Sequence, residues 1–369
     1  MWREALTAPL RALADACVRQ PLSVPVPADD AAFAARKGTL RLAMRTARRA
    51  VLLRLSGQRR HLKTYLAPAA HRLLWIHEGM PQIGDALMDL APRSLLVEQG
   101  FILDLFAAPH IASLFEGDAY FARVLCAPDA VRADDYDAVI VLSHDRKALR
   151  LKRARLAALP WVSLHGWYGG PDFHRARFAT RRLADLLGLT PAAADFARHS
   201  AQKLLLPADL ADPVDGAAHD RIALALGGVW PARTYHRWAE LVSLMSMRGQ
   251  RRFVLVGGAN GRELADALIA RFGAELDLQD GVGRASLREA QALFARAAVV
   301  VVADGGLMHL ALTTSTPVVA LFNSAIRPEW RLPTVLNGIA LQSAGAAVDD
   351  IAAESIANAV ERLRAATPR

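Results

Sequence analysis

Cysteine and long apolar runs are both scarce in this sequence. Its 369 residues include two cysteines, Cys17 and Cys126, which are too few for a disulfide framework or a cysteine-based zinc site. No stretch approaches the roughly 18 uninterrupted apolar residues of a transmembrane helix. The acidic residues Glu4 and Asp15 interrupt the apolar pattern at the N-terminus and argue against a secretory signal. We therefore expect a cytoplasmic protein with reduced thiols.

Several motifs of nucleotide and metal chemistry are also absent. The sequence has neither the GxGxxG fingerprint of dinucleotide oxidoreductases nor the GxxxxGK[ST] loop of P-loop enzymes. No metal-ligand spacing and no order of Ser, His and Asp residues indicates a metal centre or a catalytic triad. Asp135 and Asp137 do spell DxD, but they precede a predicted strand, so we interpret them as part of a turn. We expect no metal and no cofactor.

Short apolar runs alternate with helical patterns in two separate parts of the chain, as in doubly wound parallel sheets. Pro92 is expected to kink or end the helix that follows the first strand. A segment rich in Pro, Asp and Ala, residues 206–220, is the predicted linker. The runs that predict strands are 72–77, 101–107, 121–127, 136–143 and 160–166, then 221–228, 251–258, 297–304 and 316–323.

The sequence therefore predicts an α/β protein with two Rossmann-like domains and a cleft between them. Residues 71–205 form the first domain, and residues 221–369 form the second. An amphipathic helix at 347–364 ends the second domain and is the one element that could cross back to the first. Ligands of such sheets bind beyond the carboxyl ends of the strands.

A basic helical extension, residues 1–70, precedes these domains. Residues 31–77 contain eleven Lys or Arg and no Asp or Glu, whereas the whole chain has a net charge of +9. The rest of the chain therefore carries −2, and the basicity is local. If residues 36–55 form a helix, its basic side consists of Lys37, Arg41, Arg45 and Arg48, and its apolar side of Leu40, Met44, Ala47, Val51 and Leu55.

Two interpretations of this extension stay open. A basic amphipathic helix suits an anionic membrane surface or an anionic glycolipid. Alternatively, the apolar stripe packs on the first domain and the basic side faces solvent. Nucleic acid is not an expected partner, because the segment lacks interleaved aromatic residues and no nucleic-acid motif follows it.

Glycine follows three predicted strands of the second domain, at Gly227-Gly228, Gly257-Gly258 and Asp304-Gly305-Gly306. Glycine lets the backbone approach a ligand closely, and the helix that follows presents N–H groups and a positive dipole end to an anion. A diphosphate fits this arrangement, although such glycine pairs also occur for purely structural reasons.

Charged residues accompany these loops. Arg233 lies near the first glycine pair, where a guanidinium can neutralise a leaving phosphate. Asp304 ends a strand and can accept hydrogen bonds from sugar hydroxyls, and His309 lies in the following helical turn. Glu263, five residues after Gly258, either binds ribose hydroxyls or stabilises a helix N-terminus.

The first domain contributes one candidate base. Gly84-Asp85 follows the strand at 72–77 after a short loop. A carboxylate there can take a proton from an acceptor hydroxyl. The same dipeptide is also an ordinary helix-start signal.

Three stretches of the sequence together resemble glycosyltransferase family 9, the ADP-heptose:lipopolysaccharide heptosyltransferases. They are GMPQIGDALMDLAPRSLL (79–96), LALGGVWPARTYHRWAEL (224–241) and ADGGLMHLALTTSTPVVALFNSAIRPEW (303–330). The resemblance covers roughly residues 72–345 and is most specific at 301–323. It does not cover the N-terminal extension.

The resemblance implies a GT-B fold and an inverting, metal-independent transfer of heptose from ADP-heptose to a lipopolysaccharide core-type acceptor. By motif, Asp85 is the base and Arg233 faces the donor diphosphate. Glu263 matches a ribose-binding acid more loosely. The loop that holds the donor sugar and phosphates corresponds to Asp304, Gly305, Gly306, Met308 and His309.

The sequence departs from the family pattern in that loop: Ala303 and Gly305 replace the usual Asn and Ser or Thr, and Leu307 replaces a frequent Pro. Two alternatives therefore stay open. One is another GT-B transferase with a protein or a different glycan as acceptor, and the other is a non-catalytic binder of nucleotide sugar or glycolipid. The expected partners are a nucleotide-sugar donor, an anionic lipid-linked glycan and the inner face of the cytoplasmic membrane.

Overall fold

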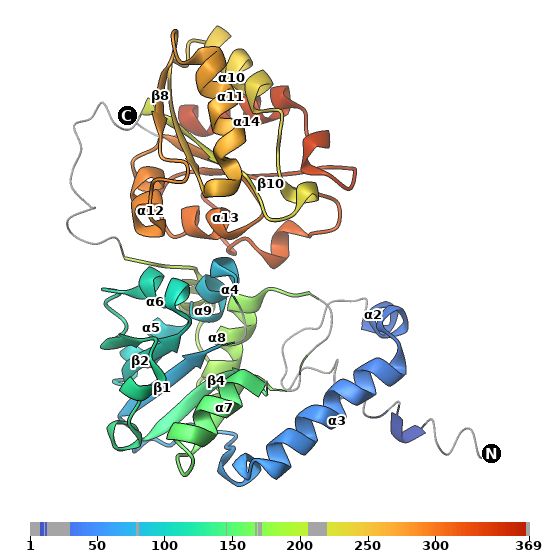
Figure 1. The fold of residues 1–369 in the computed structure, drawn as a ribbon, viewed down its shortest axis with the longest axis vertical. Coiled ribbons are helices and arrows are strands. Elements are labelled where there is room, and N and C mark those ends of the chain that lie inside the picture. The colour runs from blue at the N-terminus through green and yellow to red at the C-terminus, as the bar shows by residue number, and fades with distance from the viewer. Residues whose placement is uncertain are drawn as a thin grey trace. The chain divides into compact units, whose positions relative to one another are not determined.

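The computed structural model of the chain divides into two compact units (Figure 1). Unit 1 comprises Met1–Pro81 and Met88–Ala201, and unit 2 comprises Gln82–Leu87 and Gln202–Arg369. The structure describes residues 8–10, 12, 30–78, 81–144, 146–166, 168, 172–205 and 220–366. Apart from Asp220, the predicted linker therefore lies outside the described residues.

Unit 1 is built on a five-stranded parallel sheet in the order β3-β2-β1-β4-β5. The predicted strand at 72–77 is confirmed over its full length, whereas the one at 121–127 is shortened to three residues. The interior strands are buried along nearly their whole length, as parallel strands covered on both faces require. The strands are β1 Arg72–His77, β2 Ile102–Ala107, β3 Arg123–Leu125, β4 Ala138–Ser143 and β5 Trp161–Gly166.

The helices of unit 1 follow the strands in alternation, as predicted. Pro92 ends the first helical piece and caps the next one, so the predicted break is confirmed. Gly188, with a φ of 69°, follows the end of α8. The helices are α4 Ile83–Asp89, whose residues up to Leu87 belong to unit 2, α5 Arg93–Glu98, α6 Pro109–Phe115, α7 Arg146–Arg155, α8 Arg175–Leu186 and α9 Ala193–Ser200.

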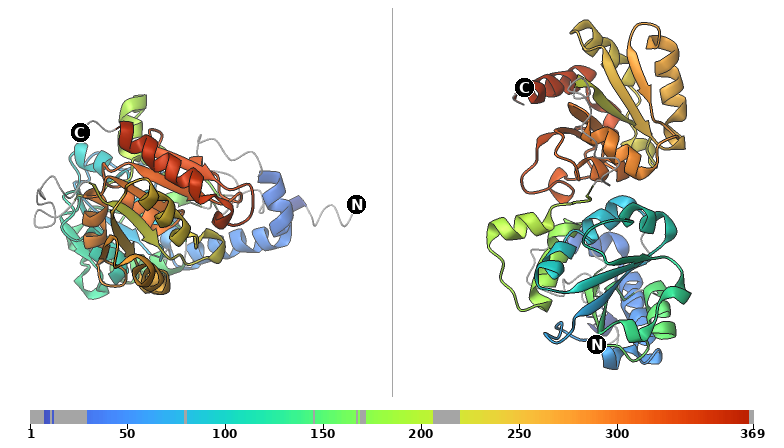
Figure 2. Two further views of the ribbon diagram at one scale, coloured as in Figure 1. Left: turned by 90° about the horizontal axis from the view of Figure 1, so that it is seen from above. Right: turned by 90° about the vertical axis from the view of Figure 1, so that its left-hand side faces the viewer.

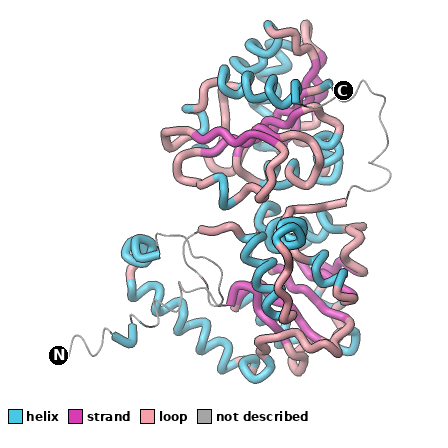
Figure 3. Tube along the Cα trace, turned by 180° about the vertical axis from the view of Figure 1, so that it is seen from behind, coloured by secondary structure: helices cyan, strands magenta, loops and turns pink. Residues whose placement is uncertain are grey.

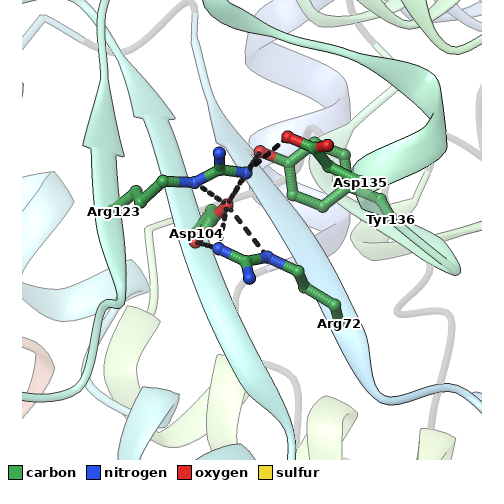
Figure 4. Close-up of polar contacts among 5 residues, drawn as sticks. All are labelled: Arg72, Asp104, Arg123, Asp135 and Tyr136. Atoms are coloured by element: carbon green, nitrogen blue, oxygen red, sulfur yellow. Dashed lines mark hydrogen bonds and ion pairs between the residues drawn. The ribbon is translucent and has the colours of Figure 1, made fainter.

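An ion-pair network joins three neighbouring strands of unit 1 (Figure 4). Asp104 on β2 is fully buried and accepts hydrogen bonds from Arg72 on β1, at 3.0 Å, and from Arg123 on β3, at 2.8 Å. The hydroxyl of Tyr136 donates to the same carboxylate at 2.8 Å, and Arg123 also pairs with Asp135. One carboxylate of the DxD thus belongs to a structural network.

Among the described residues that precede this sheet are the helices α2 Asp30–Lys37 and α3 Thr39–Leu55. Gly38, with a φ of 84°, interrupts the helix predicted over 36–55. α3 contacts α7 (Figure 1), and its buried residues are Leu42, Ala43, Thr46 and Leu53. The interpretation that the predicted apolar stripe packs on the first domain is therefore wrong: Leu40, Met44, Val51 and Leu55 are exposed.

Unit 2 contains a six-stranded parallel sheet in the order β11-β10-β9-β6-β7-β8. The four interior strands were predicted from their apolar runs. The two edge strands were not predicted, because their residues are mostly half-exposed and form no continuous apolar run. The strands are β6 Ile222–Leu226, β7 Arg252–Gly257, β8 Asp277–Asp280, β9 Val299–Ala303, β10 Val318–Phe322 and β11 Gly338–Gln342.

Helices lie on both faces of this sheet (Figure 3). α10, α11 and α14 share one hydrophobic core with the sheet, through residues such as Trp238, Leu268 and Ile356. The C-terminal helix therefore packs on unit 2, as Figure 2 shows in red. The helices are α10 Trp238–Met247, α11 Arg262–Phe272, α12 Leu287–Ala295, α13 Gly306–Ala311 and α14 Ala353–Ala366.

These findings confirm the α/β class and the two Rossmann-like sheets. Among the described residues, no helix is both long enough and apolar enough to span a membrane. Within the same part of the chain, no group of three or more His, Cys, Asp or Glu side chains is placed to hold a metal ion. Cys126 is an exposed free thiol, and Cys17 lies outside the described residues.

Candidate active site

The glycines after the strands of unit 2 allow close packing of the loops at the carboxyl end of the sheet. Gly227 has a φ of 84°, and a Cβ atom there would lie 2.8 Å from the backbone nitrogen of Gly261. At Gly257, a Cβ atom would lie 2.6 Å from the carbonyl oxygen of Leu226. Gly228 approaches the side chain of Thr234 in the same way. These glycines therefore bring the loops after β6 and β7 together.

Asp304 pairs with two arginines of unit 2. It follows β9, is 4% exposed, and its carboxylate lies 3.2 Å from Nη1 of Arg233. The Nε atom of Arg331 lies 3.6 Å from the other oxygen of the carboxylate. The structure thus unites Arg233 and Asp304, which are 71 positions apart in the sequence. Two guanidinium groups around one carboxylate leave these three side chains with a positive balance.

His309 is buried in α13, five residues after Asp304. Its Nδ1 atom lies 2.8 Å from Oε1 of Gln202, while Nε2 of Gln202 donates to the carbonyl of Arg331 at 3.2 Å. Because the amide nitrogen of Gln202 is used in this way, its oxygen faces the imidazole and accepts the Nδ1 proton. Gln202 therefore orients both His309 and the loop that carries Arg331.

The segment that carries Asp85 groups with this unit. Asp85 is half-buried in the first turn of α4. A Cβ atom at the preceding residue, Gly84, would lie 2.4 Å from Cδ2 of His309. Likewise, a Cβ atom at Gly306 would lie 2.6 Å from Cγ1 of Ile83. Glycine at both positions lets the turn of Asp85 lie against the start of α13.

The remaining predicted residues occupy different surroundings. Glu263 is exposed in the first turn of α11, and Gly258 immediately precedes the turn at Ala259–Gly261 that leads into this helix. The side chain of Met308 is fully buried, so it supports α13 by packing. At Gly305 a Cβ atom would meet no neighbour closer than 3.9 Å. A Ser or Thr would therefore fit at this position without displacing any neighbour.

Sequence reasoning missed Arg331 and Gln202. Arg331 is 8% exposed and lies in an irregular segment after β10, where its type and spacing carried no signal. Gln202 precedes the predicted linker and resembles any polar loop residue in the sequence. Both contribute to the site through long-range contacts that a local pattern does not reveal.

Unit 1 has a buried polar cluster of its own around Asp89, the last residue of α4. Asp89 is fully buried, and Nε of Arg175 donates to its carboxylate at 3.0 Å. The imidazoles of His77 on β1 and His165 on β5 each have Nε2 at 3.5 Å from the same carboxylate. Burial alone would raise the pKa of Asp89, but the charge of Arg175 lowers it well below its usual range. Burial lowers the pKa of His165 to about 3.

The buried imidazole of His144, directly after β4, makes the stability of unit 1 depend on pH. Burial, followed by the charges of Arg49 and Arg182, lowers its pKa from 6.5 to about 3. In the unfolded chain the ring regains its ordinary pKa, so only the unfolded state binds a proton as the pH falls below about 6.5. The stabilisation is thus complete above that pH and is lost progressively toward pH 3.

We predict that His144→Phe reduces the pH dependence of unfolding. Phenylalanine can retain the edge-on contact with Trp161, whose ring centroid lies 5.5 Å from that of His144. Between pH 7 and pH 5 the wild-type protein should lose about 2 kcal/mol through this group, at 1.36 kcal/mol per pKa unit. Urea unfolding at the two pH values measures the difference, with the exposed His71→Gln as control. An equal pH effect in wild type and His144→Phe would contradict the assignment.

The matches to known proteins agree with this fold. Residues 173–348 match the family model described as "Glycosyltransferase family 9 (heptosyltransferase)". A search of curated protein sequences finds no match. Among solved structures, a glycosyl transferase of family 9 from Veillonella parvula DSM 2008 has a TM-score of 0.67 and 15% identity, and the match covers 83% of this chain and all of that one.

Two Escherichia coli proteins are also similar. The ADP-heptose lps heptosyltransferase II matches with a TM-score of 0.61 and 18% identity, over 80% of this chain and 98% of its own. Heptosyltransferase WaaC with ADP bound matches with a TM-score of 0.61 and 20% identity, over 79% of this chain and 99% of its own. At these identities the matches establish the fold alone, which is GT-B.

Two parallel sheets of this topology and a family model that spans the Arg233–Asp304 pair define a glycosyltransferase. Over residues 173–348 the family model is that of glycosyltransferase family 9, so the resemblance seen in the sequence is confirmed for that part of the chain.

Proposed function

We propose that this enzyme transfers a heptose residue from ADP-heptose to a lipopolysaccharide core-type acceptor, with inversion at the anomeric carbon and without a metal ion. The observation that carries the proposal is the pairing of Arg233 with Asp304 within the region matched by the family 9 model. In support, one solved structure of WaaC contains ADP and another contains ADP-2-deoxy-2-fluoro heptose.

The proposed reaction is a single displacement. Asp85 takes the proton of an acceptor hydroxyl while that oxygen attacks the anomeric carbon. The bond from this carbon to the phosphate oxygen breaks, and ADP leaves with the electron pair. General-base action of this kind contributes on the order of 10²–10⁴ in rate.

Arg233 acts on the leaving group. Negative charge grows on the departing phosphate, and a guanidinium held by the buried carboxylate of Asp304 is already oriented to neutralise it. Glu263, exposed at the start of α11, is the proposed contact of the ribose hydroxyls. Asp304, the glycines of its loop and His309 are proposed to hold the sugar and the phosphates.

The proposed acceptor is an anionic, lipid-linked glycan, which places the enzyme at the inner face of the cytoplasmic membrane. The basic segment at residues 31–77 favours such an acceptor electrostatically, since it carries eleven cations and no acidic residue.

A thermal-shift screen of the purified protein with ADP, GDP, UDP, CMP and their sugar conjugates tests the donor. Selective stabilisation by ADP or ADP-heptose is the expected result, and this shift should be smaller in Arg233→Ala. Arg271→Ala, which removes an exposed cation from the last turn of α11, serves as control. A preference for UDP or GDP would contradict the proposed donor and indicate a different transferase reaction. No shift with any nucleotide would favour a non-catalytic role.

A further inference from the structure

One face of α3 exposes large apolar side chains to solvent. Leu40, Met44, Val51 and Leu55 are 61%, 63%, 54% and 82% exposed. These positions recur at helical spacing and form, with Ala47, a continuous ridge on one face. At 1.5 Å per residue the ridge extends for about 22 Å. Scattered apolar side chains are common on protein surfaces, but a ridge of this length indicates a surface that binds something.

Arginines border the ridge on both sides. Arg41 and Arg48, each exposed, follow Leu40 and Ala47 in the sequence and therefore lie along one edge of the ridge. Arg54, also exposed, precedes Leu55 and lies along the other edge. Since residues 31–77 contain no Asp or Glu, no acidic side chain of this segment offsets their charge.

The opposite side of α3 attaches the helix to unit 1. Leu53 belongs to the hydrophobic core that also contains Leu74, Val139 and Trp161. Arg49 donates to the backbone carbonyl of Tyr168 at 3.3 Å. The buried face of α3 is therefore part of the fold of unit 1, and the exposed ridge is available to a partner.

We propose that the exposed face of α3 is a docking surface for an anionic lipid bilayer. The apolar ridge inserts among the acyl chains near the headgroups, and the bordering arginines contact lipid phosphates. An apolar stripe with cations along both edges is the pattern of helices that lie in the plane of a membrane interface. The proposal rests on the proposed function, because a lipid-linked acceptor is the reason for a membrane location. It goes further by assigning the membrane contact to specific residues.

Sedimentation of the full-length protein with vesicles tests the ridge. Vesicles of phosphatidylcholine with about a third phosphatidylglycerol should bind the wild-type protein, and pure phosphatidylcholine vesicles should bind it much more weakly. The triple variant Met44→Ser, Val51→Ser, Leu55→Ser should partition into the anionic vesicles at least roughly ten-fold less. Its folding is not at risk because the three side chains are exposed. The control replaces Met247 and Val335, which are equally exposed on unit 2, by serine and should bind as wild type.

A second pair of variants tests the charge. Arg41→Gln with Arg48→Gln should lower the partition coefficient by roughly ten-fold or more, at about a five-fold loss for each cation. Arg251→Gln with Arg362→Gln removes the same charge from exposed positions of unit 2 and should change it little.

Three results would overturn the proposal. They are equal binding of wild type to neutral and anionic vesicles, no binding to either, and full binding by the triple serine variant. The last would show that the cations attract the chain without insertion of the ridge. Vesicle binding needs no substrate, so its failure leaves the nucleotide screen unaffected, and a failed nucleotide screen leaves vesicle binding measurable.

Discussion

Replacing Asp85 by asparagine should lower the rate of sugar transfer on the order of 10²–10⁴-fold, because the amide cannot take the proton of the acceptor hydroxyl. Donor binding should stay nearly unchanged, since the proposed donor contacts lie on other residues, among them Arg233 and Glu263. The change is close to isosteric at a half-buried position in the first turn of α4. Steady-state assays in the presence of EDTA, with ADP affinity measured by calorimetry, separate the two effects.

Asp134→Asn is a suitable control, because Asp134 is an exposed aspartate of unit 1. It should retain wild-type turnover. If Asp85→Asn turned over substrate at the rate of Asp134→Asn, the assignment of the base would be wrong. Loss of ADP affinity in Asp85→Asn would instead indicate that the carboxylate shapes the donor site, in contradiction to the proposed role.

The largest effect on stability is expected from Asp89→Ala. This carboxylate is fully buried, and its removal leaves the guanidinium of Arg175, which is 13% exposed, without its counter-charge. It also removes the group that faces the imidazoles of His77 and His165. Breaking a buried ion pair by deleting one partner costs about 3–5 kcal/mol. Denaturant unfolding of the full chain, followed by circular dichroism, measures the loss.

The matched comparison is Asp129→Ala. Asp129 is 90% exposed and pairs with Arg155 on the surface of the same unit. Exposed pairs contribute about 0–1 kcal/mol, so this variant should unfold almost as the wild type does. A cost for Asp89→Ala no greater than that for Asp129→Ala would mean that the buried cluster contributes little to unit 1.

The interior of each sheet could be predicted from the sequence because its strands are continuous apolar runs bounded by turn residues. Runs such as 73–76 and 299–303 are buried on both faces and are apolar at every position. The edge strands β8 and β11 are half-exposed and lack that signal. The apolar stripe on α3 was also recognised, but the same sequence pattern describes a stripe that packs on the protein and one that is exposed, and only the structure shows that this one is exposed.

The candidate site could be predicted only where its residues follow strands. Asp85, Asp304 and the glycine loops stand at such positions, so the rule for parallel sheets finds them. Arg331 and Gln202 act through contacts between distant segments, and no local spacing indicates them. The Asp89 cluster could have been suspected, since His77 and His165 stand at or next to the ends of predicted strands. Their common partner, Asp89, lies in the helix α4, so its position in the sequence did not indicate the contact.

The topology of the two sheets also sets an order of events during synthesis. In each sheet the strand made first ends in the interior, β1 between β2 and β4, and β6 between β7 and β9. β1 therefore leaves the ribosome before either of its partner strands. Both of its edges can be paired only after residue 143, the end of β4, has been synthesised. All five strands of the first sheet are complete at Gly166, well before Ile222 begins the second. We expect the two cores to form one after the other, with the ribosome still attached while the first one closes.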